Sequence, residues 1–214
     1  MDLDLAHRIT FGEATTYDDL DGDTVDITTG DGLALFSTAH TLRGSASTYR
    51  NTLSGSPRLS RGALEGMELL CVEETLNQFG EKMNADFDIL WTTDDPNTIN
   101  TARELLKSTS RESALNAGVV NVYEMKYRHV RCPRIATDAN GAVDSTKAKY
   151  WGLACSKDGV NSAYLHIEQE PTLEAPAAGT NAENFSTEDW TFKTRCSYGI
   201  VIVGARWIKL SAAT

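Results

Sequence analysis

Hydrophobic and polar residues alternate over residues 189–203, near the C-terminus, in the period-two pattern of a half-buried strand. The apolar parity holds Trp190, Phe192, Cys196, Tyr198, Ile200 and Ile202, and the polar parity holds Thr191, Lys193, Arg195 and Ser197. At about 3.3 Å per residue this strand spans roughly 45 Å, about the full diameter of a compact chain of this size. The length predicts an elongated sheet, or else a bend at Gly199. From Gly199 onward both parities are apolar, which predicts a strand end covered on both sides.

Two helices are predicted from the 3.6-residue spacing of apolar side chains. The first runs over about residues 60–79, with Ser60 as its N-cap and Gly80 after its end. Its broad apolar stripe consists of Leu64, Met67 and Cys71 on one row and Leu69, Val72, Leu76 and Phe79 on the next. The second begins at Asp95, a capping residue followed by Pro96 at the first helical position. Its predicted apolar face is Ile99, Ala102, Leu105 and Leu106.

Shorter apolar or alternating runs predict further strands at residues 33–36, 87–92, 119–124, 128–135, 147–155 and 163–168. The Ala-Asn-Gly run at 139–141 predicts a turn, and the segments 43–57 and 171–184 are predicted to be exposed loops. Two helices among many strands predict an α+β architecture.

Composition narrows the classes of function. The chain has 214 residues, 41% of them hydrophobic, and a formal net charge of −10. That charge argues against a nucleic-acid backbone as the main partner, because such binding requires clustered Lys and Arg. No apolar run is long enough to cross a bilayer. The four cysteines are far apart and indicate neither a zinc site nor a disulfide framework, so we expect four buried, reduced thiols.

An acidic, glycine-containing segment at residues 15–32 suggests a calcium loop. With Asp19 as the first position, Asp21 and Asp23 match the third and fifth, but Thr24 and Gly30 stand where the loop requires Gly and Glu. The sequence therefore predicts a surface loop here, with no metal ion and no cofactor.

His40 lies beside Ser37, Thr38 and Thr41, which raises the possibility of a hydrolase. A nucleophilic serine usually sits on a tight turn such as Gly-x-Ser-x-Gly, and this sequence has none there. We expect a structural histidine whose ring bonds a backbone carbonyl at the end of a strand, and no catalytic residue.

Basic residues are concentrated in one stretch, at Lys126, Arg128, Arg131 and Arg134, near Tyr127 and His129. A nucleic-acid site is one interpretation. The favoured interpretation is an interface, in which these cations meet acidic residues of the same protein or of a neighbouring subunit.

Four segments together resemble the major capsid proteins of tailed bacteriophages, in particular Mu-like head subunits with the Hong Kong 97 fold. They are Leu33-Ala-Leu-Phe-Ser-Thr-Ala-His-Thr-Leu42, Leu59-Ser-Arg-Gly-Ala-Leu-Glu65, Thr92-Thr-Asp-Asp-Pro-Asn-Thr98 and Asp189-Trp-Thr-Phe-Lys-Thr-Arg-Cys-Ser-Tyr-Gly199. The resemblance implies an axial domain at residues 57–155, an elongated peripheral domain from residues 1–42 and 160–206, and a C-terminal tail at 207–214. It also implies that the N-terminal arm, extended loop and spine helix of the family are missing.

The function implied by the resemblance is structural. Copies of the chain would form pentamers and hexamers of an icosahedral virion head, assembled in the bacterial cytoplasm, and would enclose double-stranded DNA without reading its sequence. The expected subunit interface comprises the loops 43–57 and 108–118 and the residues Lys126, Arg128, Arg131, Arg134, Lys193 and Arg195. The alternatives are the shell protein of an encapsulating compartment, a small hydrolase and a calcium-binding module.

Overall fold

The computed structural model describes residues 8–18, 22–109, 120–138, 140–157, 163–174 and 193–214. A three-stranded mixed sheet lies at the centre of its body. The middle strand, β5 (Ile89–Thr92), pairs parallel with β6 (Arg128–Arg131) and antiparallel with β7 (Trp151–Ala154). Every residue of β7 is buried, as expected for a strand covered on both faces.

The C-terminal segment is built into this core. Residues 207–214, predicted as a tail, run along the free edge of β7, where Lys209 N donates to Leu153 O and Ser211 N donates to Trp151 O, each at 2.8 Å. On its other side the segment meets residue 52 in a parallel bridge through Leu210. The end of the chain therefore joins two regions of the body that are far apart in sequence.

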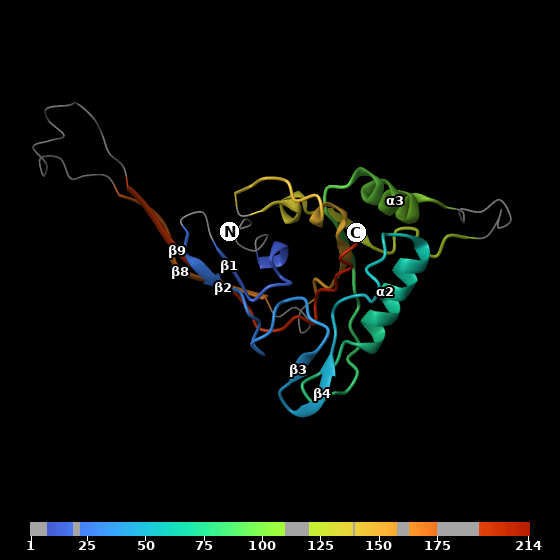
Figure 1. Ribbon diagram of the computed structural model, residues 1–214, viewed down its shortest axis with the longest axis horizontal. Helices are drawn as coiled ribbons and strands as arrows, with labels where there is room; N and C mark the ends of the chain where they lie inside the picture. Colours follow the sequence, from blue (N-terminus) through green and yellow to red (C-terminus); the bar gives the residue numbers. More distant parts are fainter. Residues whose placement is uncertain (1–7, 19–21, 110–119, 139, 158–162, 175–192) are drawn as a thin grey trace, which may run out of the picture.

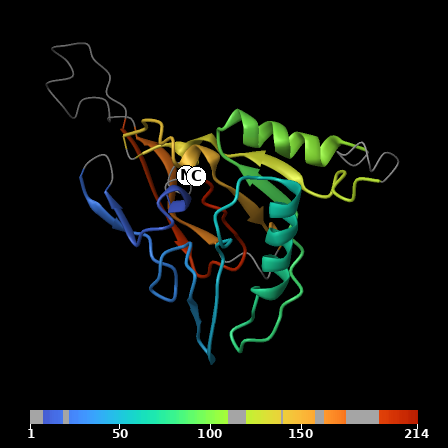
Figure 2. The ribbon, with the colours of Figure 1, turned by 45° about the vertical axis from the view of Figure 1, so that its right-hand side comes forward.

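Both predicted helices are present and begin at the predicted caps. Helix α2 (Arg61–Glu73) starts where Ser60 Oγ accepts from Ala63 N at 3.2 Å, and α3 (Pro96–Lys107) starts where the Asp95 carboxylate accepts from Thr98 N at 2.9 Å. The predicted apolar face of α3 is buried. Figures 1 and 2 show both helices on the side of the body away from the β8–β9 ribbon described below.

The prediction for α2 was wrong in two respects. The helix ends at Glu73 rather than near residue 79, because the chain turns back so that Leu76 bridges to Lys82. Of the second predicted apolar row, Leu69, Val72 and Phe79 are more than half exposed. The helix buries the face that contains Leu64, Met67 and Cys71, together with the adjacent Ala63 and Leu70.

Short antiparallel pairs lie outside the central sheet. They are β1 (Thr16–Asp18) with β2 (Thr24–Asp26), and β3 (His40–Leu42) with β4 (Ser45–Tyr49). Two 3-10 turns flank the core strands: η2 (Pro133–Ala136) follows β6, and η3 (Lys147–Lys149) precedes β7. Three predictions fail here. Residues 33–36 are buried in part but form no strand, residues 43–57 contain β4 rather than only loop, and the described residues 120–124 form a bridge and a turn.

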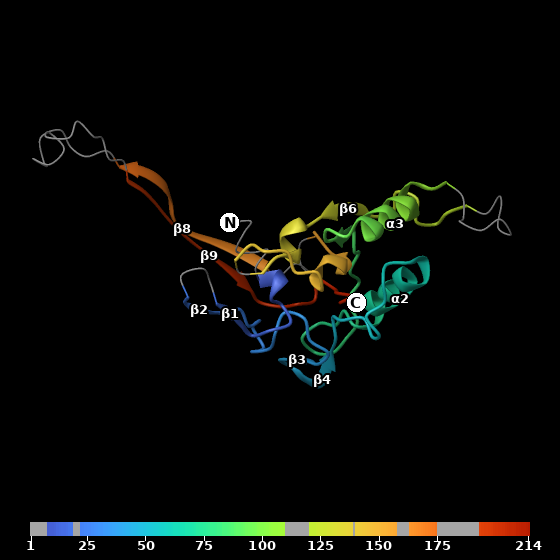
Figure 3. The ribbon, with the colours of Figure 1, turned by 45° about the horizontal axis from the view of Figure 1, so that its top comes forward.

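A two-stranded antiparallel ribbon, β8 (Ala163–Glu174) with β9 (Lys193–Ile202), projects from the body (Figures 1 and 3). Strand β9 confirms most of the predicted C-terminal strand; residues 189–192 lie outside the described residues. The predicted double coverage beyond Gly199 is wrong, since Val201 and Val203 are each 53% exposed while Ile200 and Ile202 are buried. Strand β8 continues through Pro171 to Glu174, so the predicted loop does not begin at 171.

The described elements, few helices with several separate sheets, form an α+β arrangement. None of the described helices combines the length and the apolar character that crossing a bilayer requires.

Candidate assembly surfaces

The β8–β9 ribbon is anchored at its base and exposed along its length. At the base, Ala163 pairs with Ile202 and Leu165 pairs with Ile200, and both isoleucines are buried against the body. Farther out, residues 166–173 of β8 and 193–196 of β9 are exposed. A two-stranded sheet with both faces in water is only marginally stable, so this element lacks the cover that sheets in a folded body receive.

The two edges of the ribbon differ. In β8 the register shifts twice, between Ile167 and Gln169 and between Gln169 and Thr172, and Pro171 lies inside the second shift. Each shift places an additional β8 residue against β9, which is a β-bulge. Bulges and proline protect a sheet edge from further pairing. Strand β9 has neither, so only β8 has an edge protected in this way.

Lys193 and Arg195 are exposed on the outer part of β9, opposite Glu174 and Thr172 of β8. One turn of the pleat farther in, Ser197 Oγ donates to Glu168 Oε2 at 2.8 Å. Cys196 between them is a free, exposed thiol, so the prediction that all four thiols are buried was wrong. The ribbon thus presents two cations, a carboxylate and a thiol within a few residues.

The basic stretch at 126–134 is partly neutralised by acidic residues of the same chain. Lys126 Nζ lies 2.6 Å from Glu68 Oε1 on α2 and also lies over the rings of Tyr123 and Tyr127. Arg131 Nε donates to Asp94 Oδ1 at 2.7 Å. Two of the four predicted interface cations in this stretch therefore already have a partner within the chain.

The other two cations of this stretch occupy different positions. Arg128 is exposed on β6, where its charge acts on Asp88. Burial raises the pKa of Asp88, but hydrogen bonds from Ser156 and the charge of Arg128 outweigh burial, so the pKa is lowered. Arg134 is exposed in η2, where its carbonyl accepts from the Thr10 hydroxyl at 3.3 Å. Of these two cations, Arg128 therefore lies on a strand of the central sheet and Arg134 on the 3-10 turn that follows it.

His40 is fully buried and pairs with a carboxylate that the sequence did not suggest. Its Nδ1 lies 2.8 Å from Asp31 Oδ2, its Nε2 lies 3.2 Å from Leu35 O, and its ring stacks on Tyr49. As predicted, the ring bonds a backbone carbonyl, although residues 33–36 form no strand. The nitrogen that a catalytic base would use faces that carbonyl. Through Asp31 and Leu35, His40 therefore links the irregular segment before it to the β3–β4 hairpin.

The Asp31 carboxylate accepts several of the hydrogen bonds that hold this segment. It accepts from His40, from the Thr29 hydroxyl, and from the backbone N–H groups of Leu33 and Thr41 at 3.2 and 3.1 Å. Partial burial raises the pKa of Asp31, but the hydrogen bonds from Thr29 and His40 outweigh it, so the pKa lies below its ordinary value. The donors therefore hold an ionised carboxylate.

The acidic segment at 15–32 offers no metal centre among its described residues. Asp18 accepts from the Thr24 hydroxyl at 2.8 Å, and Asp26 accepts from Thr28 N at 2.8 Å, so both carboxylates serve the β1–β2 hairpin. Asp19 and Asp21 lie outside the described residues. No group of three potential ligands is found in the part of the chain that the structure describes.

Sequence reasoning missed a buried cation at Lys209. Its side chain is fully buried, and Nζ donates to Glu74 O at 3.2 Å and to Arg50 O at 3.4 Å. Glu74 is the C-cap of α2, where a positive charge is favoured by the helix dipole. Burial lowers the pKa of Lys209 to about 8. A lysine in an otherwise apolar terminal segment was the only signal.

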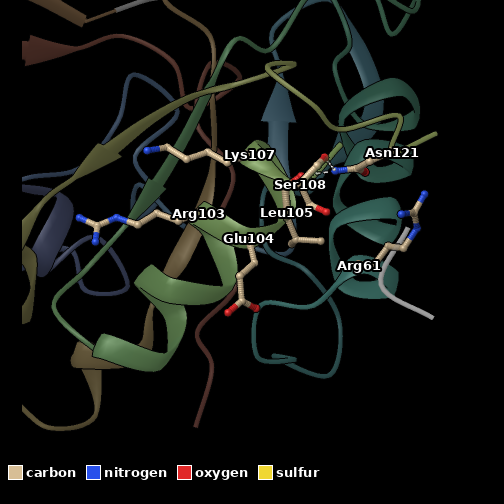
Figure 4. Close-up of a pocket in the computed structure, with 7 residues that line it drawn as sticks. All are labelled: Arg61, Arg103, Glu104, Leu105, Lys107, Ser108 and Asn121. Carbon is tan, nitrogen blue, oxygen red and sulfur yellow. Dashed lines mark hydrogen bonds between the residues drawn. The ribbon is translucent and has the colours of Figure 1, made fainter. Parts of the chain in front are cut away.

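A surface pocket of about 440 Å³ lies between α2 and the end of α3 (Figure 4). In Figure 4 the side chains of Arg103 and Lys107 extend to one side of α3 and that of Arg61 lies on the other side, on α2, so the cations do not converge. Asn121 bonds Leu105 O at 2.6 Å and Ser108 O at 2.8 Å, which closes the end of α3. The pocket thus follows from the packing of two helices.

Comparisons of the chain with protein-family models, with curated proteins and with solved structures give no match.

Proposed function

We propose that this chain is a structural subunit of a bacteriophage or prophage icosahedral head. Copies of it self-assemble into a shell that encloses double-stranded DNA. The observation that carries the proposal is the β8–β9 ribbon, which projects from the body and is exposed along residues 166–173 and 193–196 (Figure 3). An exposed two-stranded sheet gains stability when another molecule covers it, so the ribbon suits a protein whose role is contact between copies.

The resemblance to Mu-like head subunits supports the same proposal. Three of its four segments lie at structured positions of the body. The 33–42 segment contains His40, which pairs with Asp31, residues 59–65 include the start of α2, and residues 92–98 include the start of α3. The fourth overlaps β9. On this proposal, residues 57–155 correspond to an axial domain of Hong Kong 97 type, and the ribbon belongs to an elongated peripheral domain.

The net charge of −10 is compatible with a shell around DNA. A wall with little positive charge repels the packed polyanion and does not trap it during packaging or release. DNA would be confined in the virion and not recognised by sequence. The subunits would form pentamers and hexamers through heterologous contacts that close into a shell.

Negative-stain electron microscopy of the largest species from size-exclusion chromatography tests the proposal. Rings of five or six copies, or closed particles, are expected. Nucleic acid inside particles from a phage-producing host is expected for a head, whereas an enclosed enzyme would identify a compartment shell. A chain that forms no ring and no particle at any protein concentration would contradict self-assembly of this chain.

A further inference from the structure

The outer edge of β9 is open for pairing. Within the described residues, β9 is hydrogen-bonded to β8 alone and the two strands form a sheet of their own. Residues 193–196 of this strand are exposed and Ser197 and Gly199 are partly exposed. Every second residue of β9 directs its N–H and C=O groups away from β8. Because the β8 edge carries two bulges and Pro171 while β9 runs without interruption, a further strand can add to β9 and not to β8.

We propose that β9 pairs antiparallel with β9 of a second copy, around a two-fold axis. The inference rests on the proposed function in that the partner is another copy of this chain. It adds the strand, the register and the charged residues of one contact between copies. The product is a four-stranded sheet in the order β8, β9, β9, β8, with the bulged strands on the outside. Since both outer edges are then protected, pairing stops at two copies.

Symmetry fixes the choice of register. An antiparallel pair around a two-fold axis perpendicular to the sheet places residues of the same parity opposite one another, because both ribbons present the same face to the same side. In the outer part of β9 the exposed residues are 193–196, and Cys196 is the innermost of them. In the register centred there, Cys196 faces its own copy and Arg195 faces Ser197 of the other strand.

Charge complementarity supports this register. Ser197 Oγ already donates to Glu168 Oε2 of β8 at 2.8 Å. Residues opposite one another in antiparallel strands share a face, so Arg195 from the second copy arrives beside Ser197 and the Glu168 carboxylate. The two-fold axis produces this ion pair twice. Each one joins an exposed cation of one copy to a carboxylate of the other.

Neighbouring registers lose this complementarity. Moving the centre one residue outward, to Arg195, sets the two Arg195 side chains directly opposite each other, and like charges opposite each other destabilise a sheet. Moving it one residue inward, to Ser197, places Arg195 opposite Gly199, away from Glu168. Of these three registers, only the one centred on Cys196 gives both guanidinium groups a carboxylate.

A charge exchange tests the ion pairs. Sedimentation velocity should show that Arg195→Glu raises the dissociation constant of the dimer at least tenfold, that Glu168→Arg does the same, and that the double variant recovers most of the affinity. Lys82→Glu, at an exposed cation of the body outside every proposed interface, is the matched control and should leave the dimer unchanged. Circular dichroism checks that each variant is folded. A dimer unaffected by Arg195→Glu would overturn the inference, as would a wild-type chain that remains monomeric.

The native thiol tests the register itself. Opposed residues in antiparallel strands have Cα atoms about 4.5 to 5.5 Å apart, within the range that a disulfide spans. Diamide should therefore oxidise two Cys196 thiols to a disulfide, itself being reduced to the hydrazide, and give a covalent dimer on a non-reducing gel. Cys132→Ser should retain that dimer and Cys196→Ser should lose it while still associating. Association without any Cys196 cross-link would overturn the register.

The two proposals fail in different ways. Rings or particles that persist in Arg195→Glu, with no Cys196 cross-link, would leave the shell function standing and overturn the β9 pairing. A dimer that responds to the charge exchange but never forms larger rings would support the pairing and contradict the shell function.

Discussion

The body and the ribbon of this molecule are held together by different kinds of contact. In the body, strand β7 is fully buried between β5 and the C-terminal segment, so residues from three distant parts of the chain secure one another. In the ribbon, β8 and β9 pair only with each other among the residues that the structure describes. Contacts within the chain therefore cover the body, whereas the ribbon is exposed over residues 166–173 and 193–196, where we propose that a second copy pairs with it.

Two glycines express this difference at single positions. At Gly152 in β7, an added Cβ would overlap the carbonyl oxygen of Lys209 and lie 2.8 Å from Trp91 Cζ2. At Gly199 in β9, an added Cβ would meet nothing within 4 Å. The body has no room for a methyl group where the C-terminal segment crosses, whereas the ribbon has open space.

The largest expected effect is at this pair. Gly152→Ala should lower the free energy of unfolding by roughly 3 kcal/mol or more, because main chain and not a movable side chain occupies the space. Gly199→Ala should change it by no more than about 0.5 kcal/mol. Urea denaturation followed by tryptophan fluorescence compares the two. Equal destabilisation by both substitutions would contradict the distinction between body and ribbon.

The next largest effect is expected at Asp31. Asp31→Asn should lower the free energy of unfolding by about 2 kcal/mol, because His40 and the backbone donors lose their charged acceptor. Asp26→Asn, at an exposed carboxylate, is the control and should cost clearly less.

The same carboxylate sets a dependence on acid. The pKa of Asp31 is lower in the folded chain than in the unfolded chain, so its stabilisation is complete above the ordinary aspartate pKa and is lost as the pH falls through the folded value. The difference in stability between the wild type and Asp31→Asn should therefore shrink below about pH 4. A difference that is constant down to pH 2 would show that the charge is not what the donors hold.

Lys209 predicts the opposite dependence, on alkali. Its pKa of about 8 in the folded chain lies below that of an unfolded lysine, so between these values the unfolded chain binds more protons and stability rises with pH. The gain is at most about 1.4 kcal/mol per pH unit.

Comparison with Lys209→Met isolates this contribution, since Cys71 and the buried tyrosines titrate in both proteins. Thermal melts at several values from pH 7.5 to 10 should show the wild type gaining stability relative to the variant. Parallel curves would mean that the Lys209 ammonium is not penalised by burial.

The smallest effects are expected at surface cations. Arg131→Ala removes an exposed ion pair to Asp94 and should lower the free energy of unfolding by about 0.5 kcal/mol. At low protein concentration Arg195→Ala should lower it by less, since the proposed partner of Arg195 is on another molecule. A larger loss for Arg195 at the lowest protein concentration would place its partner within the same chain.

Local signals in the sequence predicted the helices well. Ser60 and the Asp95-Pro96 pair fixed the two helix starts, because a cap acts on backbone groups only a few residues away. The buried face of α3 also agreed with its spacing. The alternation in β9 predicted a strand, since a ribbon anchored on one side at its base keeps a period of two.

Long-range pairing accounts for the errors. The apolar run at 33–36 forms no strand because Asn51 and His40 bind Leu35 O, 16 and 5 residues away. Leu69 and Val72 were predicted to be buried but are exposed. The spacing of apolar residues in α2 does not show how much of the helix surface other elements cover. The role of residues 207–214 could not be read locally, since their partners are in β7 and near residue 52. The interface cations Lys126 and Arg131 were predicted by their clustering, but their partners Glu68 and Asp94 were not.

Amide hydrogen exchange at several protein concentrations tests the central claim most directly. The body amides, including those of β7, should be protected equally at every concentration. The outward amides of residues 193–199 should exchange rapidly in dilute protein and become protected as the concentration rises through the dissociation constant. Exchange in β9 that is the same at all concentrations, whether fast or slow, would contradict the account of a ribbon completed by a second copy.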